Sequence, residues 1–150
     1  MISQVFLESA GSHVMCVIKS VCPLSEIKGA VLLIPGYSQS MCDTDYFMTR
    51  LSNELVNQRY ATLQLDMYGH GDSYGDLSGL DWATIKSNIE SACEYMKEWC
   101  KYKTLVGISR GLFANALCID NISEKFDYVI CVNPITIKFD MSKYNKYHKN

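Results

Sequence analysis

The feature that most constrains the fold is a regular alternation of short apolar runs with longer segments of helical periodicity. Each apolar run has the length and composition of a strand buried on both faces. The strands predicted in this way cover residues 29–36, 61–66, 103–108 and 128–133. Apolar residues at three- or four-residue steps predict helices over 43–58, 81–100 and 110–120. This β-α-β-α-β-α-β order predicts an α/β fold with a mainly parallel, doubly wound sheet.

The two ends of the chain differ from this middle part in their pattern of apolar and polar residues. Residues 4–8 and 13–21 alternate apolar with polar side chains around a turn-like Ala10-Gly11-Ser12, which predicts an N-terminal β-hairpin. The sequence beyond Pro134 becomes polar and loses its periodicity. We therefore predict one domain over 1–135 and a polar tail over 136–150.

Composition and charge exclude several classes of partner. The net charge is −2 and no run is rich in Lys or Arg, so neither nucleic acid nor an anionic membrane is an expected partner. No apolar run approaches the length that crosses a membrane, and the start lacks the pattern of a secretory leader. We expect a cytoplasmic protein.

Cysteine and histidine usage gives no sign of a metal or a cofactor. The seven cysteines are odd in number, contain no C-x-x-C pair and lie mostly inside apolar stretches, so we interpret them as reduced core residues. The three histidines are far apart in the sequence, which disfavours zinc. No G-x-G-x-x-G follows the first buried strand, which disfavours a dinucleotide.

The segment most suggestive of chemistry is Gly107-Ile108-Ser109-Arg110-Gly111. It is a G-x-S-x-G between a predicted strand and a predicted helix, the setting in which a nucleophilic serine sits on a sharp turn. The five letters alone are a weak signal, and a serine here could instead cap the helix. The position between strand and helix favours Ser109 as a nucleophile.

A second pattern, Asp66-x-x-Gly69-x-Gly71-x-Ser73, follows the preceding strand. Together the two motifs resemble the α/β-hydrolase superfamily, in particular its lipase, esterase and aminopeptidase-like serine hydrolases, over roughly residues 13–135. The resemblance implies an acyl-serine at Ser109 and hydrolysis of an ester, thioester or amide in a small acyl substrate. It also implies an oxyanion hole formed by the backbone N–H groups of Tyr37 and Arg110. Pro35 stands where the family has a loop histidine.

Three further residues have both a structural and a chemical interpretation, and a fourth, His13, has only a structural one. By resemblance, His70 is structural within the glycine turn, and Asp66 ties down the same loop rather than serving as the triad acid. The side chain of Arg110 either orients a substrate carboxylate or phosphate, or pairs with a surface acid. His13 has no visible partner and is expected on the surface of a strand.

The resemblance also implies that parts of the site are missing. In the family the acid and histidine follow later strands, whereas this sequence stops after about strand six, so the isolated chain is expected to be inactive or weak. Asp140 and His148 have the required order but lie in the polar tail. We expect either a second chain that supplies the missing strands, acid and histidine, or a homo-oligomer formed through the strand near Val129–Val132. The alternative is a noncatalytic α/β-hydrolase-like binding or interaction protein.

Overall fold

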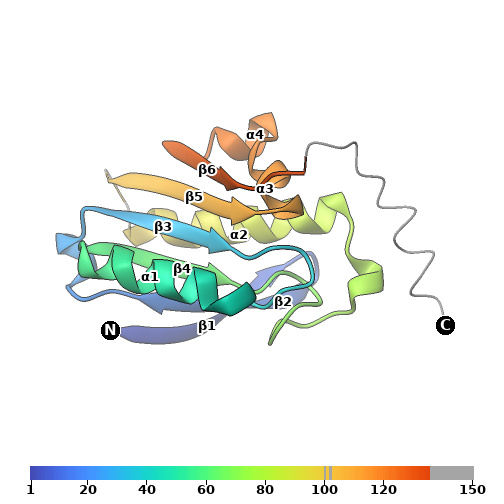
Figure 1. Ribbon diagram of the computed structural model, residues 1–150, viewed down its shortest axis with the longest axis horizontal. Coiled ribbons are helices and arrows are strands. Elements are labelled where there is room, and N and C mark those ends of the chain that lie inside the picture. Colours follow the sequence, from blue (N-terminus) through green and yellow to red (C-terminus); the bar gives the residue numbers. More distant parts are fainter. Residues whose placement is uncertain (100, 102, 136–150) are drawn as a thin grey trace.

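The computed structural model describes residues 1–99, 101 and 103–135, which form a six-stranded sheet flanked by helices (Figure 1). The strands are β1 (Ile2–Ser9), β2 (Ser12–Lys19), β3 (Gly29–Ile34), β4 (Tyr60–Leu65), β5 (Thr104–Arg110) and β6 (Tyr128–Val132), in the spatial order β1-β2-β4-β3-β5-β6. The α-helices are α1 (Phe47–Asn57), α2 (Trp82–Trp99), α3 (Leu112–Leu117) and α4 (Asp120–Ser123). Short 3-10 turns cover Leu24–Glu26, Thr44–Tyr46 and Leu77–Gly79.

The sheet is mainly parallel, which confirms the predicted fold class. Strands β4, β3, β5 and β6 are parallel neighbours, and every residue of the central strand β3 is buried. The predicted hairpin is also confirmed. Strands β1 and β2 are antiparallel around Ala10 and Gly11, whose φ angles of 50° and 70° match the two-residue turns that suit a twisted hairpin.

Helices cover both faces of the sheet. Helix α1 packs on β3 and β4 from one side, and α2, α3 and α4 lie on the other side, as Figure 1 shows for α1 in front and α2 behind. The larger core lies on the α2 side, and a smaller cluster around Leu33 and Met48 lies under α1. No helix in the described ranges is long and apolar enough to cross a membrane.

Several predicted boundaries differ from the structure, most clearly at α1, at β5 and in the helical segment after β5. Helix α1 begins at Phe47, not near Asp43, because Asp43, Asp45 and Tyr46 all have positive φ angles that interrupt the first turn. Strand β5 continues to Arg110, two residues beyond its predicted end, because it remains paired with β6 there. The predicted helix 110–120 is correspondingly shorter and divided into α3 and α4.

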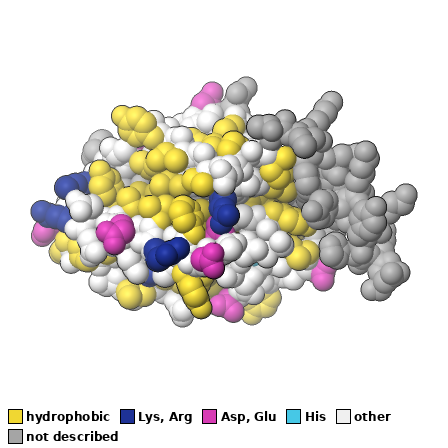
Figure 2. Space-filling view, viewed as in Figure 1, with side chains coloured by type: hydrophobic (Ala, Val, Ile, Leu, Met, Phe, Trp, Pro, Cys, Tyr) yellow, Lys and Arg dark blue, Asp and Glu magenta, His cyan; other side chains and the backbone are white. Residues whose placement is uncertain are grey.

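Among the described residues, no helix covers the α1-side face of β6, whereas Ile108 of β5 is buried in the cluster under α1. Figure 2 shows hydrophobic side chains gathered over these strands, beside α1. Tyr128 is 66% exposed and Ile130 is 48% exposed, although both belong to an apolar strand. Strand β6 pairs only with β5 in the described part of the chain, so it is an edge of this sheet. The residues of the predicted tail, Asp140 and His148 among them, lie outside the described residues.

Candidate functional site

The sharp turn between β5 and α3 is made by Gly111, not by Ser109. Gly111 has φ 61° and ψ −131°, a conformation that side-chain-bearing residues rarely adopt outside strained functional turns. Ser109 lies two residues earlier, inside β5, where it faces Ile34 of β3 and Cys131 of β6 across the sheet. The sequence motif thus predicts the neighbourhood of the turn, but the structure places a glycine at the turn itself.

Ser109 is enclosed rather than presented to a cavity. The residue is 0% exposed, and its Oγ is the one buried side-chain oxygen or nitrogen in the described ranges that has no hydrogen-bond partner. A nucleophilic serine needs a base that accepts its proton. None of the described residues is placed to accept it, so the role of Ser109 as a nucleophile stays a prediction.

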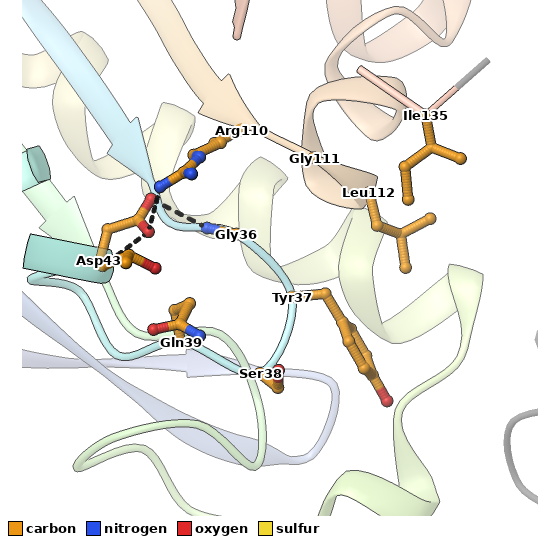
Figure 3. Close-up of a pocket in the computed structure, with 10 residues that line it drawn as sticks. Gly36, Tyr37, Ser38, Gln39, Asp43, Arg110, Gly111, Leu112 and Ile135 are labelled. Carbon is orange, nitrogen blue, oxygen red and sulfur yellow. Dashed lines mark hydrogen bonds and ion pairs between the residues drawn. The ribbon is translucent and has the colours of Figure 1, made fainter. Parts of the chain in front are cut away.

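A pocket of about 330 Å³ opens at the C-terminal ends of β3 and β5 (Figure 3). This edge is where open α/β sheets bind their ligands. Gly111 lines the pocket, and a Cβ built on it would meet no heavy atom within 4 Å. The lining residues are Gly36, Tyr37, Ser38, Gln39, Asp43, Thr44, Arg110, Gly111, Leu112 and Ile135. Tyr37 therefore lines the pocket and Ser109 does not, and the role of the Tyr37 backbone as an oxyanion donor stays a prediction.

One end of the pocket is organised by an ion pair whose acidic partner is buried. The Asp43 side chain is fully buried, and its Oδ1 lies 3.1 Å from Nη1 of Arg110. The other oxygen, Oδ2, accepts a hydrogen bond from the backbone N–H of Gly36 at 3.3 Å. The Arg110 guanidinium also lies 5.9 Å from the ring centre of Phe47. The carboxylate thus links the loop after β3 to the end of β5, and Figure 3 shows the two side chains pointing toward each other.

This ion pair bears on both interpretations of the Arg110 side chain, as a partner of an acid and as a donor to a ligand. Arg110 does pair with an acid, but that acid is buried in the pocket wall and not on the surface. The Arg110 side chain itself remains 34% exposed. The backbone of Arg110, predicted as an oxyanion donor, belongs to β5 and pairs in register with Val132.

His70 holds the loop that lines the pocket. Its Nδ1 lies 2.9 Å from the carbonyl oxygen of Tyr68, and its Nε2 accepts a hydrogen bond from the Ser38 backbone N–H at 3.0 Å. Burial lowers the pKa of His70, which keeps the ring neutral so that Nε2 can accept. The predicted structural role is confirmed. His13 is exposed on β2, also as predicted.

Asp66 ties together two loops below the same pocket. Its carboxylate accepts hydrogen bonds from the backbone N–H groups of Met41 and Asp72, and the side chain is almost completely buried. Desolvation raises the pKa of Asp66, partly opposed by these two hydrogen bonds. A Cβ on Gly71 would lie only 2.0 Å from Asp66 Oδ2. The predicted loop-binding role of Asp66 is confirmed, and it explains the glycine.

Sequence reasoning missed two residues that shape the pocket. Asp43 is the first residue of the predicted helix 43–58, and its partner Arg110 lies 67 positions away. Asn115 on α3 binds the backbone of Ile135 twice, donating to its carbonyl at 2.6 Å and accepting from its N–H at 3.0 Å. This clamp holds Ile135 against the pocket. The Asp43-Thr44 pair before a helix was the available signal for Asp43.

The described residues give little support for a metal site. No group of three or more potential ligands among His, Cys, Asp and Glu occurs in the part of the chain that is described. The described cysteines are free thiols, but not all are core residues as predicted. Cys16 and Cys93 are buried, with thiol pKa values raised by desolvation, while Cys118 is exposed.

Neither a protein-family model nor a curated protein matches this chain. Solved structures do match. Est1E from Butyrivibrio proteoclasticus, with ferulic acid bound, aligns at 17% identity and a TM-score of 0.76 over 92% of this chain and 61% of its own. The thioesterase domain from the curacin biosynthetic pathway aligns at 17% identity and a TM-score of 0.72, over 98% of this chain and 50% of its own.

An α/β serine hydrolase without a lid from Xanthomonas campestris is similar as well. It aligns at 13% identity with a TM-score of 0.70, over 94% of this chain and 65% of its own. The chain thus spans about half to two thirds of the length of these solved structures. With the sheet order, the hairpin and the helices on both faces, these similarities establish that the protein has the α/β-hydrolase fold that its motifs had indicated.

Proposed function

We propose that this protein is a noncatalytic member of the α/β-hydrolase fold that binds a small acyl compound in the pocket beside Gly111. The observation that carries this proposal is the glycine at the strand-to-helix turn. In serine hydrolases the nucleophile sits on that turn. Here the turn has no side chain, and the nearest serine is enclosed in β5. A turn without a serine side chain supports a binding role over acyl transfer at this position.

The pocket has the chemistry of an amphipathic ligand site. Arg110 and Gln39 lie at its polar side, while Leu112 and Ile135 line the other side (Figure 3). One guanidinium nitrogen is engaged by Asp43, and arginine has further N–H donors that can reach a carbonyl or carboxyl group. The volume of about 330 Å³ is at the lower end of small-ligand pockets. A short acid or ester with an apolar body fits this description.

Ferulic acid is a suitable first probe, because it is an aromatic carboxylic acid that Est1E binds on the same fold. We expect saturable binding of ferulic acid, measured by calorimetry. Leucine at Gly111 would extend into the open space of the pocket, so Gly111→Leu should abolish binding. Gly11→Leu is the matched control, since Gly11 also has a positive φ and an open Cβ direction but lies in the hairpin turn. Equal binding by both variants would refute this pocket.

Serine hydrolysis through Ser109 is the second candidate, favoured by the unpaired hydroxyl of Ser109. A buried hydroxyl without a partner is unusual and calls for an explanation, such as a catalytic role. Labelling with a fluorophosphonate probe separates the candidates. We expect no labelling of the wild-type chain; labelling that disappears in Ser109→Ala would instead establish an activated serine and end the noncatalytic proposal.

We also propose that another polypeptide covers β6, because Tyr128 and Ile130 are exposed on an unpaired edge strand. It is either a second copy of this chain or a chain that carries further strands of the fold. Light scattering on the purified protein distinguishes a dimer from a monomer. Ile130→Lys should dissociate a dimer, whereas Ile119→Lys, at a position of similar exposure outside β6, should not. A monomer directs the search to a partner.

A further inference from the structure

Two cysteines on neighbouring elements lie in direct contact, apart from the pocket. Cys118 follows the last residue of α3, and Cys131 lies in β6. Their Sγ atoms are 3.3 Å apart, although 13 positions separate them in the sequence. Both thiols also reach the carbonyl oxygen of Ala114, at 3.5 Å and 3.4 Å. The shared acceptor holds the two sulfur atoms on the same side of the helix.

We propose that Cys118 and Cys131 form an intramolecular disulfide when the folded protein meets a low-molecular-weight disulfide such as oxidised glutathione. A disulfide needs its sulfur atoms at about 2.05 Å, so the pair must close by only about 1.3 Å from the observed 3.3 Å. This is within reach of small side-chain rotations. The inference is independent of the proposed ligand.

Exposure determines the order of the two steps. Cys118 is exposed, so its thiolate attacks one sulfur of the small disulfide and expels a small thiolate, leaving a mixed disulfide on Cys118. The thiol of Cys131 then loses its proton to water and attacks Cys118 Sγ, expelling the second small thiolate. The protein loses two electrons and two protons, and the small disulfide is reduced to two thiols.

The first step also activates the second thiol. Burial raises the pKa of Cys131 to about 11, and the neighbouring Cys118 thiol contributes to that increase. Once Cys118 carries a mixed disulfide, it no longer bears the thiol that contributes to this increase. Cys131 then ionises more readily than in the reduced protein, which favours closure over reversal.

The other described cysteines lack this arrangement. Cys16 and Cys93 are buried in the core, where raised thiol pKa values disfavour reaction. Cys22 and Cys42 are partly buried, and no contact between either sulfur and another cysteine is seen among the described residues. Selectivity for one pair is therefore expected.

Mass spectrometry of the full chain tests the proposal. The folded protein is incubated with oxidised glutathione, free thiols are alkylated, and the chain is digested with trypsin. Cleavage after Arg110, Lys125 and Lys138 gives two peptides, 111–125 and 126–138, each with a single cysteine. We expect these peptides to appear linked, two hydrogen masses below their sum, and to separate after reduction.

Two variants complete the experiment. Cys118→Ser should remove the linked peptide, while Cys22→Ser, the matched control, should retain it. Oxidation should also raise the Tm of the wild-type protein and of Cys22→Ser, but not of Cys118→Ser, because only an intact pair constrains the unfolded chain. Alkylation of both Cys118 and Cys131 after oxidation, or linkage of either to a different cysteine, would overturn the proposal.

Discussion

The two buried serines Ser109 and Ser52 should respond in opposite ways to the same substitution. Both are 0% exposed, but Ser52 Oγ lies 2.7 Å from the Thr62 hydroxyl, whereas Ser109 Oγ has no partner. A buried polar group without a hydrogen bond costs about 1–3 kcal/mol. Ser109→Ala removes that cost and leaves a void of only one oxygen atom. We expect it to raise the free energy of unfolding by about 1 kcal/mol.

Ser52→Ala removes a satisfied hydroxyl and leaves the buried Thr62 hydroxyl without the one side-chain partner that it has among the described residues. We expect it to lower the free energy of unfolding by about 1–2 kcal/mol. For a chain of this size, each kcal/mol corresponds to about 2–4 °C in Tm. Urea denaturation and calorimetry measure both changes.

The opposite signs make this pair of variants a sharp test of the site. Destabilisation by Ser109→Ala comparable to that of Ser52→Ala would mean that the Ser109 hydroxyl has a partner in solution. The enclosed position of Ser109 in β5 would then be incorrect, and so would the argument that places Gly111 at the turn.

Three further outcomes follow from the loops and the clamp. Because burial lowers the pKa of His70 below 6.5, the stability from its neutral ring is present above pH 6.5 and lost as the pH falls through the folded-state pKa. Urea denaturation from pH 8 to pH 5 should show a steeper loss for wild type and His13→Gln than for His70→Gln. Gly71→Ala should cost about 1–3 kcal/mol in chemical denaturation and more than Gly11→Ala, since both have positive φ but only Gly71 abuts a buried carboxylate. Asn115→Ala removes two hydrogen bonds to the segment that closes the pocket, so it should lower stability by about 1–2 kcal/mol and weaken ferulic acid binding in calorimetry.

The fold was predictable because local patterns in the sequence determine its helices and strands. Apolar runs such as 29–36 and the helical spacing of 81–100 appear in the structure as β3 and α2, with ends shifted by no more than two residues, apart from Cys100 outside the described residues. Burial on both faces leaves a parallel strand little choice of composition. The order of these elements then restricts the topology to very few arrangements.

The pocket was less predictable because its contacts are distant in sequence. The ion pair of Asp43 with Arg110 depends on how two loops meet above the sheet, and no local pattern encodes it. The position of Gly111 at the turn was not predicted, for a different reason. The spacing of G-x-S-x-G shows that a strand gives way to a helix nearby, but pairing with β6 decides which residue is the last of the strand.

Gly107 provides the physical reason for this register. It faces the ring of Phe126, and a Cβ at that position would lie 3.0 Å from the nearest ring carbon. Moving Ser109 to the turn would slide β5 by two residues along its neighbours. Each side chain would stay on the same face of the sheet but would move by about 6.6 Å along the strand. Leu105 would then occupy the place of Gly107, and its side chain would collide with the ring. Of these two registers, only the observed one puts a glycine there.

Nuclear Overhauser contacts between β3 and β5 measure the register directly. The observed pairing places Ile34 opposite Ser109 and Leu32 opposite Gly107. A slide of two residues would instead place Ile34 opposite Gly107. Cross-strand contacts from Ile34 to Ser109 are therefore expected. Contacts from Ile34 to Gly107 in their place would mean that Ser109 occupies the turn, which would favour serine hydrolysis over ligand binding alone. The choice between a binding protein and a serine hydrolase thus depends on the alignment of one pair of strands.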